Sequence, residues 1–119
     1  MARPVRMQVS RKAGFNLQAA SLAINGLPAR LVTRPGPWGN PFSIDAVART
    51  YGLDRAAAQA KAVAMAGDWL RGTLDPQLSP GDPPTRDTIR RELAGHNLAC
   101  WCKPGTPCHA DVLIDLANG

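Results

Sequence analysis

Two short stretches in which apolar and polar residues alternate, and one short apolar run, predict three strands. The alternation is clear at residues 7–10 and 29–33. Residues 97–102 contain a run of apolar residues bounded by polar ones, which is typical of a buried strand. The sheet formed by these strands is expected to be small, because each stretch is only four to six residues long.

Capping residues and apolar residues at three- and four-residue spacing predict two helices in the middle of the chain. Ser43 begins a short helix that runs to residue 51, and Asp54 begins a longer one that runs to about residue 71. The inner face of the longer helix is predicted from its apolar residues at helical spacing. These residues are Ala56, Ala60, Val63, Gly67 and Leu70.

Two further helices are predicted near the C-terminus. Thr85 begins one that ends at Gly95. The pair Thr106-Pro107 is a specific start signal, since proline is well tolerated at the first helical position behind a threonine cap. The last helix is therefore predicted over residues 108–117.

The order of predicted elements, β-β-α-α-α-β-α, indicates an α/β or α+β fold in which helices pack on a small sheet. Residues 74–84 contain four prolines and one glycine, and we expect a surface loop there. A chain of 119 residues can form one hydrophobic core and is too short for two. Residues 1–119 are therefore predicted to be a single domain.

Composition is that of a globular protein in a reducing compartment. Hydrophobic residues make up 45% of the chain, and no stretch approaches the roughly 18 consecutive apolar residues of a membrane span. The basic first residues are not followed by an apolar segment, so no signal peptide is expected. We therefore expect a cytoplasmic protein without a membrane partner, whose three cysteines are reduced thiols.

Charge is distributed unevenly along the chain. The formal net charge is +5, yet residues 1–44 carry six basic groups and no acidic one, while residues 45–119 carry eight basic and nine acidic groups. Such an asymmetry suits a phosphate-bearing partner, either a nucleotide or a nucleic acid, with Arg11 and Lys12 among the candidate contacts. The alternative is a basic face that is simply solvated.

Three thiols and an imidazole lie within ten residues near the C-terminus. Cys100 and Cys102 are two residues apart on the third predicted strand, so they point to one side and Trp101 to the other. A short turn returns Cys108 and His109 to the strand, and we expect the Cys108 sulfur within about 8 Å of the other two. The four residues match the Cys3His set of structural zinc. Because Cys108 and His109 diverge by about 100° around a helix, three ligands plus a water fit better than all four.

A second interpretation makes Cys108 a reactive thiol. The free backbone N–H groups at the start of a helix favour an anion, so the Cys108 pKa is expected to be lowered, with His109 and Asp111 as acid–base or orienting partners. The same N–H groups could instead hold a phosphate. A third interpretation, inert packing of small buried thiols, is the weakest because all three cysteines cluster. The metal and thiol interpretations carry equal weight.

The loop at residues 34–42 contains residues that are unusual in a turn. Trp38 and Phe42 offer flat surfaces for a base or sugar, although packing into the core is the more common role of such side chains. Asn40 can both donate and accept hydrogen bonds, Gly39 permits close approach of the backbone, and Arg34 can bind a phosphate. We expect Asn40 and Cys108 to face a common pocket, because loops that precede helices gather at one edge of an α/β sheet.

Two motifs resemble the family DUF4326, a domain of unknown function found in bacteriophages and bacteria. They are WGNPF at residues 38–42 and LACWCKPGTPCHADVL at residues 98–113, and the opening QVSRKAGF at residues 8–15 is similar to that of many members. The resemblance implies a phage-type protein, in the host cytoplasm if phage-encoded, and raises the weight on both motifs forming one site. It implies no established activity.

These observations lead to one functional hypothesis and two rivals. The first is a nucleotide- or nucleic-acid-directed protein whose Cys/His site joins the loop at residues 34–42; if it is an enzyme, it depends on a thiol or a metal such as zinc. The second is a zinc-stabilised nucleic-acid-binding module without catalytic activity. The third is a small scaffold or host-interaction protein.

Overall fold

A parallel sheet forms the centre of the protein, which a computed structural model describes over residues 2–34 and 36–119. β1 (Arg6–Gln8) and β2 (Ala29–Leu31) flank β3 (Asn97–Cys100), so the strand order is β1-β3-β2. The last strand in the sequence is thus the central one. It brings the cysteine motif to the middle of one edge of the sheet.

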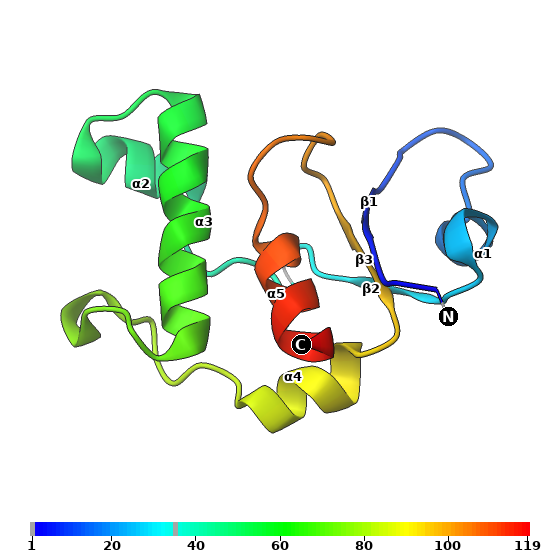
Figure 1. Ribbon diagram of the computed structural model, residues 1–119. Coiled ribbons are helices and arrows are strands. Elements are labelled where there is room, and N and C mark those ends of the chain that lie inside the picture. The colour runs from blue at the N-terminus through cyan, green and yellow to red at the C-terminus, as the bar shows by residue number, and fades with distance from the viewer. Residues whose placement is uncertain (1, 35) are drawn as a thin grey trace.

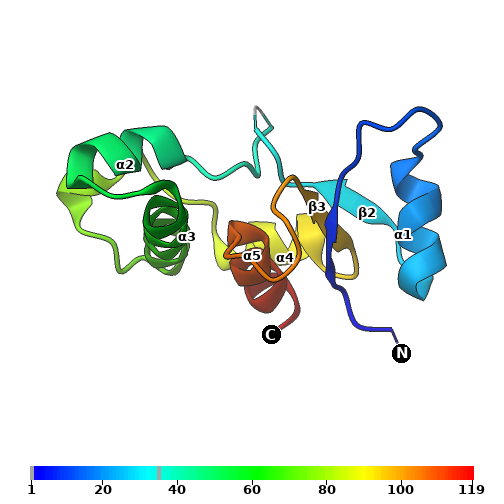
Figure 2. The same ribbon diagram turned by 90° about the horizontal axis from the view of Figure 1, so that it is seen from above.

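Helices cover both faces of the sheet, and a pair of helices lies beyond them. Figure 1 and Figure 2 show α1 (Leu17–Asn25) on one side of the strands, and α4 (Arg86–Leu93) and α5 (His109–Asn118) on the other. α2 (Ile44–Tyr51) and α3 (Arg55–Arg71) pack against each other, and α3 contacts α5. The layers are therefore α2–α3, α4–α5, the sheet, and α1.

The side chains of β3 alternate between two cores. Leu98 and Cys100 lie in the core between the sheet and the helices α4 and α5, whereas Ala99 lies in the core between the sheet and α1. α4 contributes Ile89 and Leu93, which are fully buried. The cysteine motif thus emerges from the better-filled side of the sheet.

α1 is a helix that the hydrophobic pattern does not predict. Its ends carry ordinary signals, since Asn16 caps it and Gly26 ends it with a left-handed backbone, φ 80°. Ser21 is its fully buried residue, while Leu22 and Ile24 are exposed. Only Leu17 and Ala20 of the helix pack against the apolar core below it, which is too short a repeat to reveal the helix as a periodic pattern.

A buried polar network also fixes α1 to β3. The Asn97 side chain, which is fully buried, donates to Ser21 Oγ at 2.8 Å and to Asn25 Oδ1 at 2.8 Å. Its own Oδ1 accepts from the backbone N–H of Val5 at 2.9 Å. These bonds satisfy an amide that would otherwise be costly to bury.

The predicted inner face of α3 is wrong at its first two residues only, since Val63 and Leu70 are half-buried. Ala56 and Ala60 are exposed, although Gly67 is buried as expected. In an alanine-rich helix small side chains occur on every side, so their spacing alone cannot select the buried face. The contacts with α2 and with α5 select it. The buried residues are Ala58, Ala62, Met65, Ala66 and Gly67.

Other predictions on the fold are confirmed or differ at the ends of elements. The α/β class, with helices packed on a small sheet, is confirmed. β3 ends at Cys100 rather than at residue 102, and Trp101 is 46% exposed rather than buried. The expected loop at residues 74–84 contains one 3-10 turn, Pro76–Leu78. Among the described residues no helix is long and apolar enough to cross a bilayer.

Candidate metal centre and adjoining cavity

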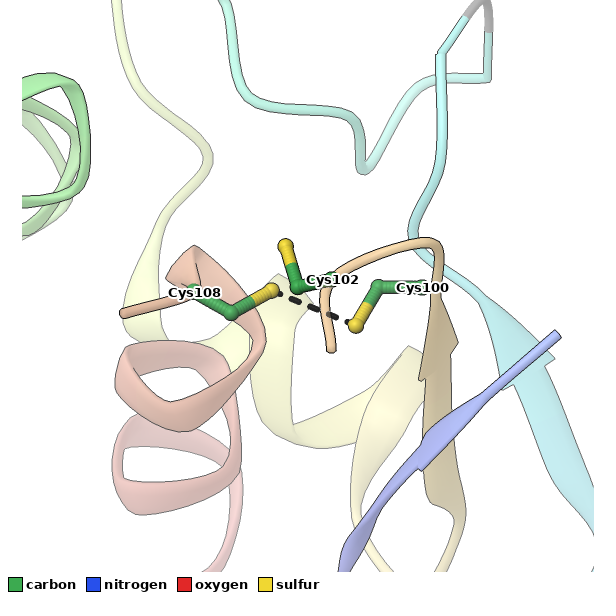
Figure 3. Close-up of side chains that lie close together, drawn as sticks. All are labelled: Cys100, Cys102 and Cys108. Carbon is green, nitrogen blue, oxygen red and sulfur yellow. Dashed lines mark hydrogen bonds between the residues drawn. The ribbon is translucent and has the colours of Figure 1, made fainter. Parts of the chain in front are cut away.

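The three cysteine sulfurs converge at the end of β3. The Sγ atoms of Cys100, Cys102 and Cys108 all lie within 4.8 Å of one another, and Cys108 and Cys100 are 3.3 Å apart. Figure 3 shows the side chains next to each other, one from the strand, one from the turn and one from the start of α5. Cys100 and Cys108 are buried and Cys102 is half-buried, so the cluster lies near the surface on the Cys102 side. The sulfurs are closer together than the sequence required.

Arg6 holds the turn that brings the sulfurs together. Its guanidinium donates to the carbonyl of Thr106 at 2.7 Å and to that of Lys103 at 3.2 Å. It also forms an ion pair with Asp111 at 3.0 Å, and its side chain is only 12% exposed. One arginine from β1 thus fixes both ends of the turn and places a positive charge beside the thiols.

The start of the last helix differs from the prediction. α5 begins at His109, and Cys108 is its N-cap residue with an extended backbone and no capping hydrogen bond from its side chain. Thr106, the expected cap, donates its hydroxyl to the carbonyl of Lys103 at 2.6 Å instead. The proline-rich turn therefore ends later than its start signal suggests, and the Cys108 thiol remains available to the other two.

The cluster favours a negative charge on Cys102. The thiols of Cys100 and then Cys108 can donate hydrogen bonds to its thiolate, which lowers the pKa of Cys102 to about 3, and the charge of Arg6 adds to this effect. The same contacts, together with burial, raise the pKa of Cys100. The lowered pKa thus belongs to Cys102, which the sequence assigned to metal binding alone.

The geometry suits a metal ion bound by three thiolates. With zinc–sulfur distances of about 2.3 Å, sulfurs around a tetrahedral ion lie about 3.8 Å apart. The sulfur–sulfur distances in this cluster lie on both sides of that value or close to it. The Cys100 and Cys108 sulfurs are 3.3 Å apart, and no pair of the three is more than 4.8 Å apart. Small side-chain shifts would bring all three to one ion. The chemistry of the set, three soft sulfur donors, suits zinc and other thiophilic metals.

His109 and Asp111 lie beside the cluster and have other partners. The Nε2 atom of His109 is 2.9 Å from the carbonyl oxygen of Trp38, and its Nδ1 is 3.9 Å from the Cys108 sulfur. Asp111 is held by Arg6, and burial raises its pKa. His109 is not part of the set of ligand atoms that lie within 4.8 Å of one another.

A cavity of about 340 Å³ opens next to the sulfurs. The turn at residues 101–108, which we call the cysteine turn, forms one wall. α3 and the loop at residues 34–42 form the opposite wall. Gln59 of α3 spans the two walls, since its side-chain amide donates to the carbonyl of Pro107 at 2.7 Å. The predicted site residues that line this cavity are Arg34, Asn40, Phe42, Cys100, Cys102, Cys108 and His109.

The loop at residues 34–42 uses much of its chemistry to hold its own shape. Asn40 accepts from the backbone N–H of Phe42 at 2.8 Å and donates to the carbonyl of Ala62 at 3.3 Å. Arg34 donates from Nε to the carbonyl of Asn40 at 2.6 Å. A Cβ on Gly39 would lie 3.0 Å from the backbone nitrogen of Arg34, so the loop closes only around a glycine.

The aromatic residues of this loop divide between core and cavity. Phe42 lines the cavity and packs against the α2–α3 core, while Trp38 packs against the core of α4, α5 and the sheet. Trp38 and Gly39 lie outside the cavity, against a small hollow that they share with His109. Trp38 therefore contributes to the site through its carbonyl contact with His109.

The basic residues at the N-terminus do not enter the cavity. Arg11 and Lys12 are exposed in the turn after β1. The guanidinium of Arg11 lies 4.6 Å from the ring centroid of Trp101, which itself lines the cavity. The basic segment thus reaches the mouth of the site through an aromatic side chain.

The sequence prediction misses several residues of the site, among them Trp101, which lines the cavity, together with Arg6, Arg55 and Gln59. Arg6 organises the cysteine turn, and Arg55 and Gln59 line the cavity from α3. The uneven charge of the first third includes Arg6, but nothing in the sequence distinguishes it from its neighbours. Arg55 and Gln59 sit on a helix whose inner face the periodicity assigns incorrectly, so the sequence carried no usable signal for them.

Residues 8–119 match the family described as "Domain of unknown function (DUF4326)". Since the match covers nearly the whole chain, the protein belongs to this family. Neither the curated proteins nor the solved structures contain a match.

Proposed function

We propose that this DUF4326 protein binds one metal ion, zinc in the simplest case, through Cys100, Cys102 and Cys108. The ion then presents an open position to a phosphate-bearing ligand, a nucleotide or nucleic acid, in the adjoining cavity. The observation that carries the proposal is the convergence of three sulfurs within 4.8 Å at the wall of a cavity of about 340 Å³.

Three protein ligands are typical of a zinc site that keeps one position for water or substrate, whereas four close a structural site. His109 lies near enough to approach the ion, but its Nε2 atom is already 2.9 Å from the Trp38 carbonyl. A metal ion with an open position acts as a Lewis acid on the group that binds there. The half-buried Cys102 marks the side on which that position meets solvent.

The cavity offers a binding surface for phosphate on the wall opposite the sulfurs. Arg34 and Arg55 both lie in its lining, and Phe42 adds an apolar wall. Asp45 also lies there and pairs with Arg55 at 3.2 Å, so Arg34 is the stronger candidate for a direct phosphate contact. The three unpaired cysteines suit a reducing cytoplasm.

Metal analysis of protein purified without added metal tests the centre. We expect one equivalent of bound metal per chain, and an intense thiolate-to-metal charge-transfer band after replacement by cobalt. Serine substitutions of Cys100, Cys102 and Cys108, one at a time, should remove the metal or weaken its binding at least tenfold. Metal-free wild-type protein that takes up no metal on titration would overturn the proposal.

The two histidines provide a matched comparison for the fourth position. His109→Asn should leave one bound metal per chain and change the cobalt spectrum only slightly, because three sulfurs remain. His96→Asn is the control, since His96 contacts the carbonyl of Ala94 away from the cavity. Loss of the metal in His109→Asn alone would show a closed Cys3His site instead of an open one.

A second candidate function is thiol chemistry, which the lowered pKa of Cys102 supports. A half-buried thiolate beside Arg6 can act as a nucleophile towards a ligand in the cavity. The two candidates differ in what a metal does. Zinc bound to the cluster should protect Cys102 from alkylation in either case. It should strengthen dTMP binding if the metal centre is the functional state, and should block the reaction of Cys102 with the ligand if the free thiolate is.

A further inference from the structure

We infer that the cavity mouth is a binding site for single-stranded nucleic acid, in which Trp101 stacks on a base and Arg11 and Lys12 contact the phosphates. This rests on the proposed function and goes further by selecting a strand over a free nucleotide. The juxtaposition behind it is an exposed indole on the rim of the cavity with a guanidinium against its ring.

Trp101 occupies an unusual position for so large an apolar side chain. It is 46% exposed and lines the cavity from the turn between Cys100 and Cys102. Its carbonyl also accepts a bond from the Gln8 side chain at 3.4 Å. The backbone of Trp101 is thus hydrogen-bonded to β1 while its side chain stays half-exposed. An exposed indole is the kind of surface on which bases stack.

Arg11 supplies a cation at the same place. Its guanidinium lies 4.6 Å from the centroid of the Trp101 ring, a cation–π distance. Lys12 follows it, and both are exposed in the turn after β1. Arg6, by contrast, is committed to the cysteine turn and the Asp111 carboxylate. Arg11 and Lys12 are thus the basic groups placed to follow a phosphate backbone past the ring.

The size of the cavity separates a strand from a mononucleotide. About 340 Å³ lies at the low end of the range for small-ligand sites, roughly 300–1,000 Å³, and admits one nucleotide at most. Arg11 lies outside the lining and Trp101 is half-exposed, so a free nucleotide seated inside leaves the guanidinium and the outer part of the indole without a partner. They fit the next base and phosphate of the same strand. In a duplex these bases are already stacked on their neighbours, so a single strand is favoured.

Binding of labelled ten-nucleotide oligo(dT) and oligo(rU), followed by fluorescence anisotropy at low salt, tests the inference. Unlabelled dTMP, UMP and a ten-base-pair duplex serve as competitors. We expect at least one of the two oligonucleotides to bind at least tenfold more tightly than the monophosphates and the duplex. The comparison of oligo(dT) with oligo(rU) shows whether DNA or RNA is preferred. Equal competition by a monophosphate or by the duplex would overturn the inference.

Tryptophan variants provide the residue-level test. Trp101→Ala should weaken oligonucleotide binding about tenfold, whereas Trp101→Phe retains a stacking surface and should stay within about threefold of wild type. Trp69→Ala is the matched control, because the Trp69 indole donates to the Gly81 carbonyl at 2.8 Å, outside the metal cavity. Unchanged affinity in Trp101→Ala, with the fold intact by circular dichroism, would contradict the stacking role.

The salt dependence tests the phosphate contacts separately. Replacing both Arg11 and Lys12 by alanine should reduce the slope of log affinity against log salt by about 1.4, at roughly 0.7 for each single-strand phosphate contact. Arg91→Ala on α4 is the control and should not change the slope. An unchanged slope in the double variant would overturn the inference. Wild-type protein that binds metal and dTMP but not the oligonucleotides overturns this inference alone, whereas absence of metal uptake overturns the proposed function.

Discussion

The cysteine turn and the loop at residues 34–42 face each other across one cavity, yet they use their unusual residues in different ways. In the turn, the three cysteine sulfurs lie within 4.8 Å of one another, and all three can bind one metal ion. In the loop, both ends of the Asn40 amide are bonded to backbone atoms, those of Phe42 and Ala62. A polar group that the fold already satisfies has little capacity left for a ligand.

The difference shows how to weigh specialised residues in a sequence. Glycine, asparagine and proline are chosen as often for the shape of a loop as for chemistry, and at Gly39 and Asn40 the shape explains them fully. Clustered thiols have no comparable role in shaping a turn. The cysteine turn is therefore the chemical half of the site, and the loop is the wall that completes it.

The largest effect is expected from the pH dependence of alkylation in metal-free protein. Because the pKa of Cys102 is about 3, it remains a thiolate from pH 8 down to pH 5, whereas the reactive fraction of an ordinary thiol falls about tenfold per pH unit. The rate at Cys102, measured by iodoacetamide labelling and mass spectrometry, should therefore be nearly constant. The urea-unfolded protein is the control, and its rate should drop about a thousandfold over that range. If the alkylation rate of Cys102 in the folded protein also fell tenfold per pH unit, Cys102 would be an ordinary thiol and the prediction would be wrong.

The second largest effect is expected from a chelator, whose effect on stability should depend on the cysteine turn and not on the loop at residues 34–42. If the ion binds only the folded chain, its removal lowers the free energy of unfolding by about 4 kcal/mol when metal stands at a thousand times its Kd. Thermal unfolding with and without chelator measures this difference. Cys108→Ser should lose at least about a third of this response, whereas Asn40→Ala should keep it in full. A full chelator response in Cys108→Ser would place the metal elsewhere.

Much of the fold could be predicted because helix ends are marked locally. The caps at Ser43, Asp54 and Thr85 are all found in the structure. What failed depends on packing between distant segments. α1 is held largely by the Asn97 network, and the inner face of α3 is set by its contacts with α2 and α5, so neither appears as a clear periodic pattern.

The site shows the same division. A short turn between strand and helix forces Cys100, Cys102 and Cys108 together, and so the spacing alone predicts their proximity. Arg6 is almost a hundred positions away from the turn it holds, and Gln59 reaches the turn from a separate layer of the fold. Residues that act at such a separation leave no local trace in the sequence.

Asn40→Ala should break the loop and leave the metal centre in place. Its amide bridges the Phe42 N–H and the Ala62 carbonyl in a half-buried position, and leaving buried groups without partners costs about 1–3 kcal/mol. The sequence interpretation of Asn40 as a surface ligand predicts no change in stability, so urea unfolding distinguishes the two. Asn40→Asp retains the acceptor for Phe42 and should lose less. Bound metal per chain should stay at the wild-type value in both variants.

The smallest effect is expected at Gln59, the residue that joins the two halves. Its amide donates to the Pro107 carbonyl at 2.7 Å, but this bond is exposed, so Gln59→Ala should lower the free energy of unfolding by no more than about 1 kcal/mol. The bond nevertheless ties α3 to the cysteine turn across the cavity, and its loss should loosen the position of the Arg34 wall relative to the sulfurs. We therefore expect weaker dTMP binding with unchanged metal content. Gln77→Ala is the control, because Gln77 lies in the exposed 3-10 turn and does not line the cavity. If Gln59→Ala and Gln77→Ala bind dTMP equally well, the two walls hold their spacing without this bond, and the loop and the turn are independent parts of the molecule.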